Sequence, residues 1–161
     1  CTEKGEALAV NLLKKHRLIE RLLVDYLELP WDAVHDLACK LEHYVSMDVA
    51  NRIGAKLGHP TTCPHGNPID ATFDDGSFRL LDVNQSETYF VVKVTDERED
   101  FLGYIQGIGL VPGAEIFIEE KTPFGDVLNI HVRASNRIVA IGKEVATAIF
   151  VRSDSKQQGL V

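Results

Sequence analysis

Two imidazoles, a thiol and a carboxylate recur at short intervals in the segment VHDLACKLEHYV, residues 34–45, as His35, Cys39, Glu42 and His43. On a continuous α-helix these four side chains would fall within an arc of about 100°. Their donor atoms suit Fe²⁺, Mn²⁺, Co²⁺, Ni²⁺ or Zn²⁺ better than Ca²⁺ or Mg²⁺, which prefer oxygen alone. A solvated polar face with one buried cysteine is the alternative.

A second pair, His16 and Glu20, lies one helical turn apart in an apolar stripe. The stripe contains Leu12, Leu13, Ile19, Leu23 and Leu27. A bare carboxylate would be costly there, so the pair is either a buried ion pair or part of a metal site. Antiparallel packing of the first two helices could add His35 to it.

Two other combinations of reactive residues are less persuasive. Cys63 and His65, in CPHG, lack the second Cys/His pair that a structural zinc site needs, and a rigid turn is favoured. Cys39 and His43 could offer a nucleophile and a base, but no glycine-rich turn accompanies them to form an oxyanion hole. We therefore assign no catalytic residue and do not expect an enzyme.

Helical elements must position these residues. Apolar periodicity predicts helices from Glu3 to about Leu27 and from Trp31 to about Tyr44, separated by Pro30. Ser46 is the expected N-cap of a third helix that runs through Leu57. Residues 1–58 form the expected helical domain, and residues 59–76, rich in Pro, Gly, Asn and Asp, the expected linker.

Residues 77–152 are expected to be mostly β. The expected strands are FRLLDV, TYFVVKV, AEIFIEE, VLNIHV, RIVAI and ATAIFV, with one short helix in EDFLGYIQGIGLVPG. Turn signals such as Phe124-Gly125-Asp126 separate them. Short strands at this density predict a small barrel, followed by a polar tail at 153–161. The fold class is therefore α+β.

Composition narrows the range of functions. The 161 residues carry a net charge of −7, which disfavours non-specific binding to nucleic acid, and no apolar run or leader predicts a membrane or secretory segment. Cys1, Cys39 and Cys63 are too widely spaced to predict a disulfide framework. We expect a protein of the reducing cytoplasm.

The run KHRLIERLLVDYLELPWDAVHDLACKLEHYVS followed by CPHGNPI resembles the diphtheria-toxin-repressor family of iron-dependent transcriptional regulators. The later segment GIGLVPGAEIFI resembles the SH3-like domain that this family shares with ferrous-iron-transport accessory proteins. The resemblance implies an all-α metal-binding and dimerisation domain followed by an SH3-like β-barrel. Family members begin with a winged helix-turn-helix, and CTEKGEALA resembles the segment just after it, so we expect the DNA-reading head to be missing here.

The resemblance also assigns site residues. It implies an ancillary metal site at His16, Glu20 and His35 and a primary, regulatory site at Cys39, Glu42 and His43, which in the family is completed by a methionine of the head. Two further ancillary ligands, a Glu and a Gln in the family, would correspond to Asp96 and Glu99. An anion contact would fall on Arg17 and Asn67, with Cys63 where the family can have serine.

The implied function is a metal-dependent repressor, with Fe²⁺ the foremost ion and Mn²⁺ the next. Metal would shift a homodimer towards the state in which both heads fit operator DNA, which this acidic part would not bind alone. Val49, Ile53 and Leu57 on the third helix would either join the dimer contact or form intramolecular core. A metal-buffering or scaffold protein without a DNA role is the alternative, and a metalloenzyme is the least favoured.

Overall fold

A computed structural model describes residues 3–123 and 127–153. Cys1, the turn expected at 124–126 and the tail after Ser153 lie outside the described residues. The chain forms two compact units, Cys1–Asp75 with Glu97–Asp100, and Gly76–Asp96 with Phe101–Val161. None of the described helices has the length and apolar character needed to cross a membrane.

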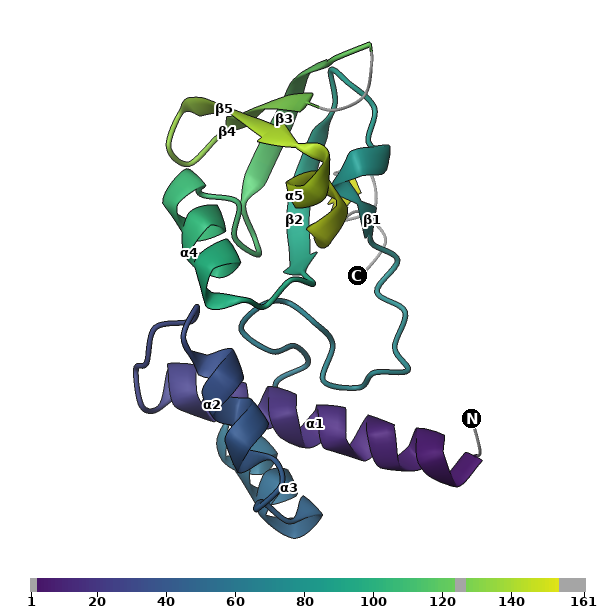
Figure 1. Ribbon diagram of the computed structural model, residues 1–161, viewed down its shortest axis with the longest axis vertical. Helices are drawn as coiled ribbons and strands as arrows, with labels where there is room; N and C mark the ends of the chain where they lie inside the picture. Colours follow the sequence, from purple (N-terminus) through teal and green to yellow (C-terminus); the bar gives the residue numbers. More distant parts are fainter. Residues whose placement is uncertain (1–2, 124–126, 154–161) are drawn as a thin grey trace. The chain divides into compact units, whose positions relative to one another are not determined.

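The first unit is built on helix α1, Glu3–Asp25, against which α2, Val34–Leu41, and α3, Met47–Lys56, both pack (Figure 1). Apolar residues of α1 divide between the two partners. Ile19 and Leu23 join Val34 and Ala38 of α2, whereas Leu18 joins Ala50 of α3. The bounds of α1 agree with those predicted from the apolar periodicity, and those of α3 with the helix predicted to follow the Ser46 cap.

The second helix is shorter than expected at both ends, because it begins at Val34 rather than Trp31 and ends at Leu41 rather than near Tyr44. The amide of Tyr44 donates to Leu41 O, 3.0 Å away and only three residues earlier, so the last turn tightens towards 3₁₀ geometry. Glu42 and His43 consequently lie just beyond α2. The single helical face expected for Cys39, Glu42 and His43 does not continue that far.

The segment after α3 is folded rather than extended. A turn closes where the Cys63 amide donates to Asn67 O at 2.8 Å and the Gly66 amide to Cys63 O at 3.0 Å, with Gly66 at a φ of 86°. Ile69 then packs against Leu18 and the rest of the α1–α3 core. Residues 63–69, which the sequence analysis placed in a linker, are thus largely buried in the first unit.

The second unit is a six-stranded antiparallel sheet in the order β1-β6-β2-β3-β4-β5. Its strands are β1 Phe78–Arg79, β2 Thr88–Val94, β3 Glu115–Lys121, β4 Val127–Val132, β5 Arg137–Gly142 and β6 Ile149–Ser153. Helix α4, Glu99–Ile108, buries Phe101, Leu102 and Ile105. Opposed pairs such as Ile118 with Ile130 and Ile130 with Val139 place apolar side chains on one face.

Two strand predictions were wrong in part. Only Phe78–Arg79 of FRLLDV pairs as a strand, and Leu80–Asp82 is a 3₁₀ turn (η1), which lets Leu80 and Val83, three residues apart, both be buried. In ATAIFV the alanines belong to helix α5, Lys143–Ala148, and the strand begins at Ile149. Alanine favours helix over strand, so the change falls where local propensity places it.

The Ser46 side chain caps α3 by accepting a hydrogen bond from the Val49 amide at 3.3 Å. Ser46→Ala should lower the free energy of unfolding by about 1 kcal/mol, because that helix amide loses its acceptor. Urea denaturation followed by circular dichroism measures the change. Ser135→Ala, in an exposed turn, is the control, and equal effects for both variants would contradict the cap.

Candidate metal centre

The carboxylate of Glu20 is fully buried at the centre of the first unit. Its Oε1 lies 2.9 Å from His16 Nε2, 3.4 Å from His35 Nδ1 and 3.5 Å from His65 Nδ1. Its Oε2 is also buried and has no hydrogen-bond partner among the described residues. Buried carboxylate oxygens normally have a partner, so this arrangement needs a positive charge beside Glu20.

A first donor group surrounds Glu20. His16, Glu20, His35 and Glu97, the histidine–glutamate cluster, place one ligand atom each within 4.8 Å of one another. Glu97 belongs to the first unit, and its Oε2 lies 2.8 Å from His35 Nδ1. Two imidazoles and two carboxylates are a donor set that divalent transition metals accept.

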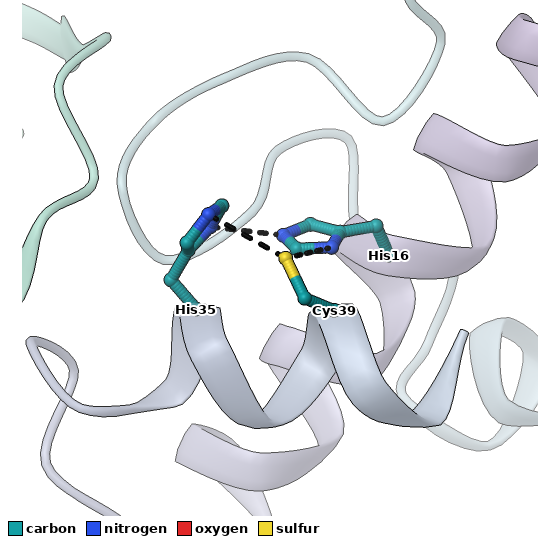
Figure 2. Close-up of side chains that lie close together, drawn as sticks. All are labelled: His16, His35 and Cys39. Carbon is teal, nitrogen blue, oxygen red and sulfur yellow. Dashed lines mark hydrogen bonds between the residues drawn. The ribbon is translucent and has the colours of Figure 1, made fainter. Parts of the chain in front are cut away.

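The thiol of Cys39 lies beside the same histidines (Figure 2). Its Sγ is 3.6 Å from His35 Nε2, one turn away on α2, and 4.0 Å from His16 Nδ1 on α1. The two imidazoles are also close, with His16 Nε2 3.2 Å from His35 Nδ1. His16, His35 and Cys39 therefore form a second possible donor group.

A third donor group, the thiol cluster, consists of Glu20, Cys63, His65 and Glu97. Cys63 and His65 come from the CPHG turn, and Cys63 Sγ lies 4.0 Å from His65 Nδ1. CPHG forms the turn that was predicted from its sequence, and this turn also directs the side chains of Cys63 and His65 towards Glu20. No sequence pattern indicated this donor group, because Glu20 and Glu97 are far from the CPHG turn along the chain.

The charged groups of this centre stabilise one another. Burial disfavours the Glu20 carboxylate, but hydrogen bonds with His16 and His65 outweigh it and lower the pKa of Glu20 from 4.5 to about 2. Burial likewise disfavours a charged His65, yet hydrogen bonds to Cys63, Glu20 and Glu97 raise its pKa to about 12. The pKa of His16 is raised in the same way by Glu20 and Glu42 against its burial.

Of the three residues expected at the regulatory site, only Glu42 is buried. Its Oε2 lies 2.7 Å from His16 Nδ1, so the His16 ring stands between Glu42 and Glu20. The His43 side chain is 64% exposed and approaches Glu42 Oε1 at 3.5 Å. Within the described residues, Cys39, Glu42 and His43 do not form one of the close donor groups.

The expected carboxylates Asp96 and Glu99 flank the one that reaches the cluster, Glu97. Glu99 lies in the first turn of α4, where a carboxylate interacts favourably with the helix dipole, and its side chain is exposed. Asn67 donates to Glu97 Oε1 at 2.8 Å, and Arg17 donates to the Pro68 carbonyl. Arg17 therefore contacts the residue that follows Asn67 in the chain, and no anion contact of either residue is tested by these hydrogen bonds.

The donor set fits a divalent transition metal. The buried Oε2 of Glu20 has no hydrogen-bond partner in the part of the chain that the structure describes, and imidazole nitrogens surround the other oxygen of the same carboxylate. A cation bound here would replace the protons that otherwise neutralise the centre. Histidine and carboxylate ligands would hold it, with thiolate available from Cys39 or Cys63.

Comparison with known families matches both units. Residues 2–71 match the iron dependent repressor, metal binding and dimerisation domain, and residues 78–153 match the FeoA domain. The iron-dependent repressor IdeR of Mycobacterium leprae is 37% identical over 166 residues, covering 93% of this chain and 71% of the relative. The diphtheria toxin repressor of Corynebacterium diphtheriae is 30% identical, covering 89% of this chain and 60% of the relative.

Solved structures give the same result. A manganese-dependent transcriptional repressor in complex with manganese superposes with a TM-score of 0.87 at 32% identity, covering 94% of this chain and 73% of that one. The crystal structure of T. acidophilum IdeR gives a TM-score of 0.82 at 29% identity, covering 95% of this chain and 72% of that one. These relatives are transcriptional repressors.

Acid should destabilise the metal-free chain through Glu20. Its folded pKa is depressed, so its contribution is present above pH 4.5 and is lost as the pH falls towards 2. The loss should be on the order of 3 kcal/mol. Urea denaturation from pH 5 to pH 2, with chelator present, should show a steeper decline for the wild type than for Glu20→Gln. Parallel profiles would contradict the assignment.

Proposed function

This chain belongs to the iron-dependent repressor family and carries the metal-binding and dimerisation domain of a metal-dependent transcriptional repressor, and we propose that Fe²⁺ is the ion it senses. Fe²⁺ is supported by the match to repressors described as iron-dependent and by the FeoA domain. Mn²⁺ accepts the same imidazole and carboxylate donors, and Co²⁺, Ni²⁺ and Zn²⁺ are further candidates.

The burial of Glu20 among three histidines carries this proposal. We assign His16, Glu20, His35 and Glu97 to the ancillary ion. Glu97 takes the role that the resemblance gave to Asp96 and Glu99, which remain candidate outer carboxylates. Arg17 and Asn67 remain candidates for an anion contact, since both lie at the turn beside Glu97.

Cys39, Glu42 and His43 are proposed to hold the regulatory ion. The exposed His43 supports this assignment because its Nε2 lies 3.5 Å from Glu42 Oε1. His16 links the two sites, because its Nδ1 faces Glu42 and its Nε2 faces Glu20. An ion that binds one nitrogen of His16 would therefore orient the ring for the carboxylate on the other side.

Two copies of the chain are proposed to associate through apolar surface that the first unit leaves exposed. Leu8 on α1 is 72% exposed and Val49 on α3 is 45% exposed. Ile53 packs partly against the Leu18 core, so it contributes to both the fold and the surface. Such a homodimer would present two DNA-binding domains to operator DNA in the cytoplasm, with metal favouring the matched spacing.

Replacing a proposed ligand should weaken metal binding. His35→Ala should raise the Kd for Mn²⁺ by at least about tenfold, because even an outer-shell partner of a metal ligand is worth about 10–100-fold. Isothermal titration calorimetry measures the change, with anaerobic Fe²⁺ as the second ion. His131→Ala, outside the donor groups, is the control. Equal affinity in the two variants would contradict the ancillary site.

The proposed regulatory role of Cys39, Glu42 and His43 is tested by measuring DNA binding. A protein joining this chain to a repressor DNA-binding domain should bind operator DNA only with metal, and Glu42→Ala or His43→Ala should abolish the effect. Electrophoretic mobility shifts measure binding, and sedimentation measures dimerisation, which Val49→Asp should weaken. Tight metal binding without any effect on DNA would favour a metal buffer instead.

A further inference from the structure

Glu42, a proposed ligand of the regulatory ion, is held by α1 through both its backbone and its side chain. Lys15 Nζ donates to the Glu42 carbonyl oxygen at 2.8 Å, and the next residue, His16, contacts Glu42 Oε2 through Nδ1 at 2.7 Å. The other carboxylate oxygen, Oε1, lies 3.5 Å from His43 Nε2. One oxygen of the Glu42 carboxylate therefore faces α1, and the other faces the next proposed ligand.

The carbonyl that Lys15 binds belongs to the C-terminal end of α2. Glu42 is the C-cap of this helix, and its own amide donates to Ala38 O at 2.9 Å. The last carbonyls of a helix have no partner within the helix and carry partial negative charge, so a cation beside them is favourable. The ammonium group of Lys15 supplies both the hydrogen-bond donor and the positive charge from a different helix, α1.

The hydrogen bond from Lys15 also determines where His43 begins. The Glu42 carbonyl lies in the same planar peptide group as the His43 amide and the His43 Cα. The regular helix that carries Cys39 has already ended at Leu41, and the Tyr44 amide turns back to Leu41 O at 3.0 Å. A contact that fixes the Glu42 carbonyl therefore fixes the peptide that joins two proposed ligands beyond the end of α2.

We propose that Lys15 is a positioning residue for the regulatory ion, because it holds the Glu42–His43 peptide against α1 in the place from which both side chains can bind metal. This inference rests on the proposed metal-sensing function. The Lys15 ammonium is also a positive charge close to a cation site, and its two effects have opposite signs. Positioning of the ligands strengthens metal binding, whereas charge repulsion weakens it. The direction in which the Kd changes when Lys15 is replaced therefore distinguishes the two effects.

The test uses the full chain with Cys1→Ser and Cys63→Ser, which leaves Cys39 as its single thiol. Co²⁺ at the regulatory site should produce an ultraviolet thiolate-to-metal charge-transfer band that Cys39→Ser and Glu42→Ala each abolish. Titration of this band gives the Kd of the regulatory site. Lys15→Met removes the donor and the charge but keeps a side chain of similar length, and it should raise this Kd by at least about tenfold.

Matched variants and a second ion separate positioning from a general effect on folding. Lys15→Arg keeps a donor and the charge and should restore most of the affinity, and Lys14→Met, at the neighbouring half-buried lysine, is the control. Mn²⁺ binding at the histidine–glutamate cluster, identified by its loss in His35→Ala, should keep its Kd in Lys15→Met, because Glu42 is not one of its ligands. Added salt should leave the ratio of the Co²⁺ Kd values unchanged, since ions screen a charge but do not move a peptide.

The other outcomes overturn the inference in distinguishable ways. An unchanged Co²⁺ Kd in Lys15→Met means that Lys15 does not position the ligands, and a lower Kd means that charge repulsion prevails. An equal loss of Co²⁺ and Mn²⁺ affinity, or a loss in Lys15→Arg as large as in Lys15→Met, means that Lys15 serves the fold alone. All of these leave the proposed function intact. Co²⁺ that gives no band dependent on Cys39 and Glu42 overturns the proposed regulatory site and the inference with it.

Discussion

The burial of one carboxylate, that of Glu20, constrains everything around it in the first unit. A carboxylate without water is tolerated only where positive charge or hydrogen bonds replace the solvent. The chain supplies imidazoles from three places: His16 on α1, His35 on α2 and His65 in the turn after α3. The charge of Glu20 is therefore balanced only when the three segments pack together, so packing and charge balance depend on each other.

His16 differs from the other two histidines because each of its ring nitrogens contacts a different buried carboxylate. Nε2 faces Glu20 and Nδ1 faces Glu42, so the imidazole spans the gap between two carboxylates contributed by different helical segments. Lys15 donates to the Glu42 carbonyl at 2.8 Å and holds that residue near α1. A single imidazole ring therefore connects the Glu20 centre with Glu42, which is a short path for coupling the two proposed metal sites.

The sequence predicted what depends on local patterns and missed what depends on distant contacts. The apolar periodicity of α1, the Ser46 cap and strands such as β2 and β4 are local signals, and the structure confirms them. The predicted end of α2 was wrong because no residue pattern marks the tighter backbone turn that follows Leu41. The helix at Ala146–Ala148, where a strand was predicted, could have been found from alanine's weak strand propensity.

The donor groups show the same limit. Spacing along a helix paired His16 with Glu20, and packing of adjacent helices suggested His35. Neither argument reaches Glu97, which enters from a segment between β2 and α4, or explains why CPHG points inwards. A single carboxylate in an irregular segment carries no periodic signal, and the family resemblance placed the contribution on its neighbours.

The first unit is discontinuous along the chain. It consists of Cys1–Asp75 and Glu97–Asp100, and the residues between them, Gly76–Asp96, belong to the second unit. During synthesis from the N-terminus, the three helices emerge well before Glu97 is added. A nascent chain at that stage has Glu20 and its histidines but not Glu97, the second carboxylate of both the histidine–glutamate cluster and the thiol cluster. The centre therefore matures late in translation, after β2 has been made, and a half-made chain is poorly equipped to capture an ion.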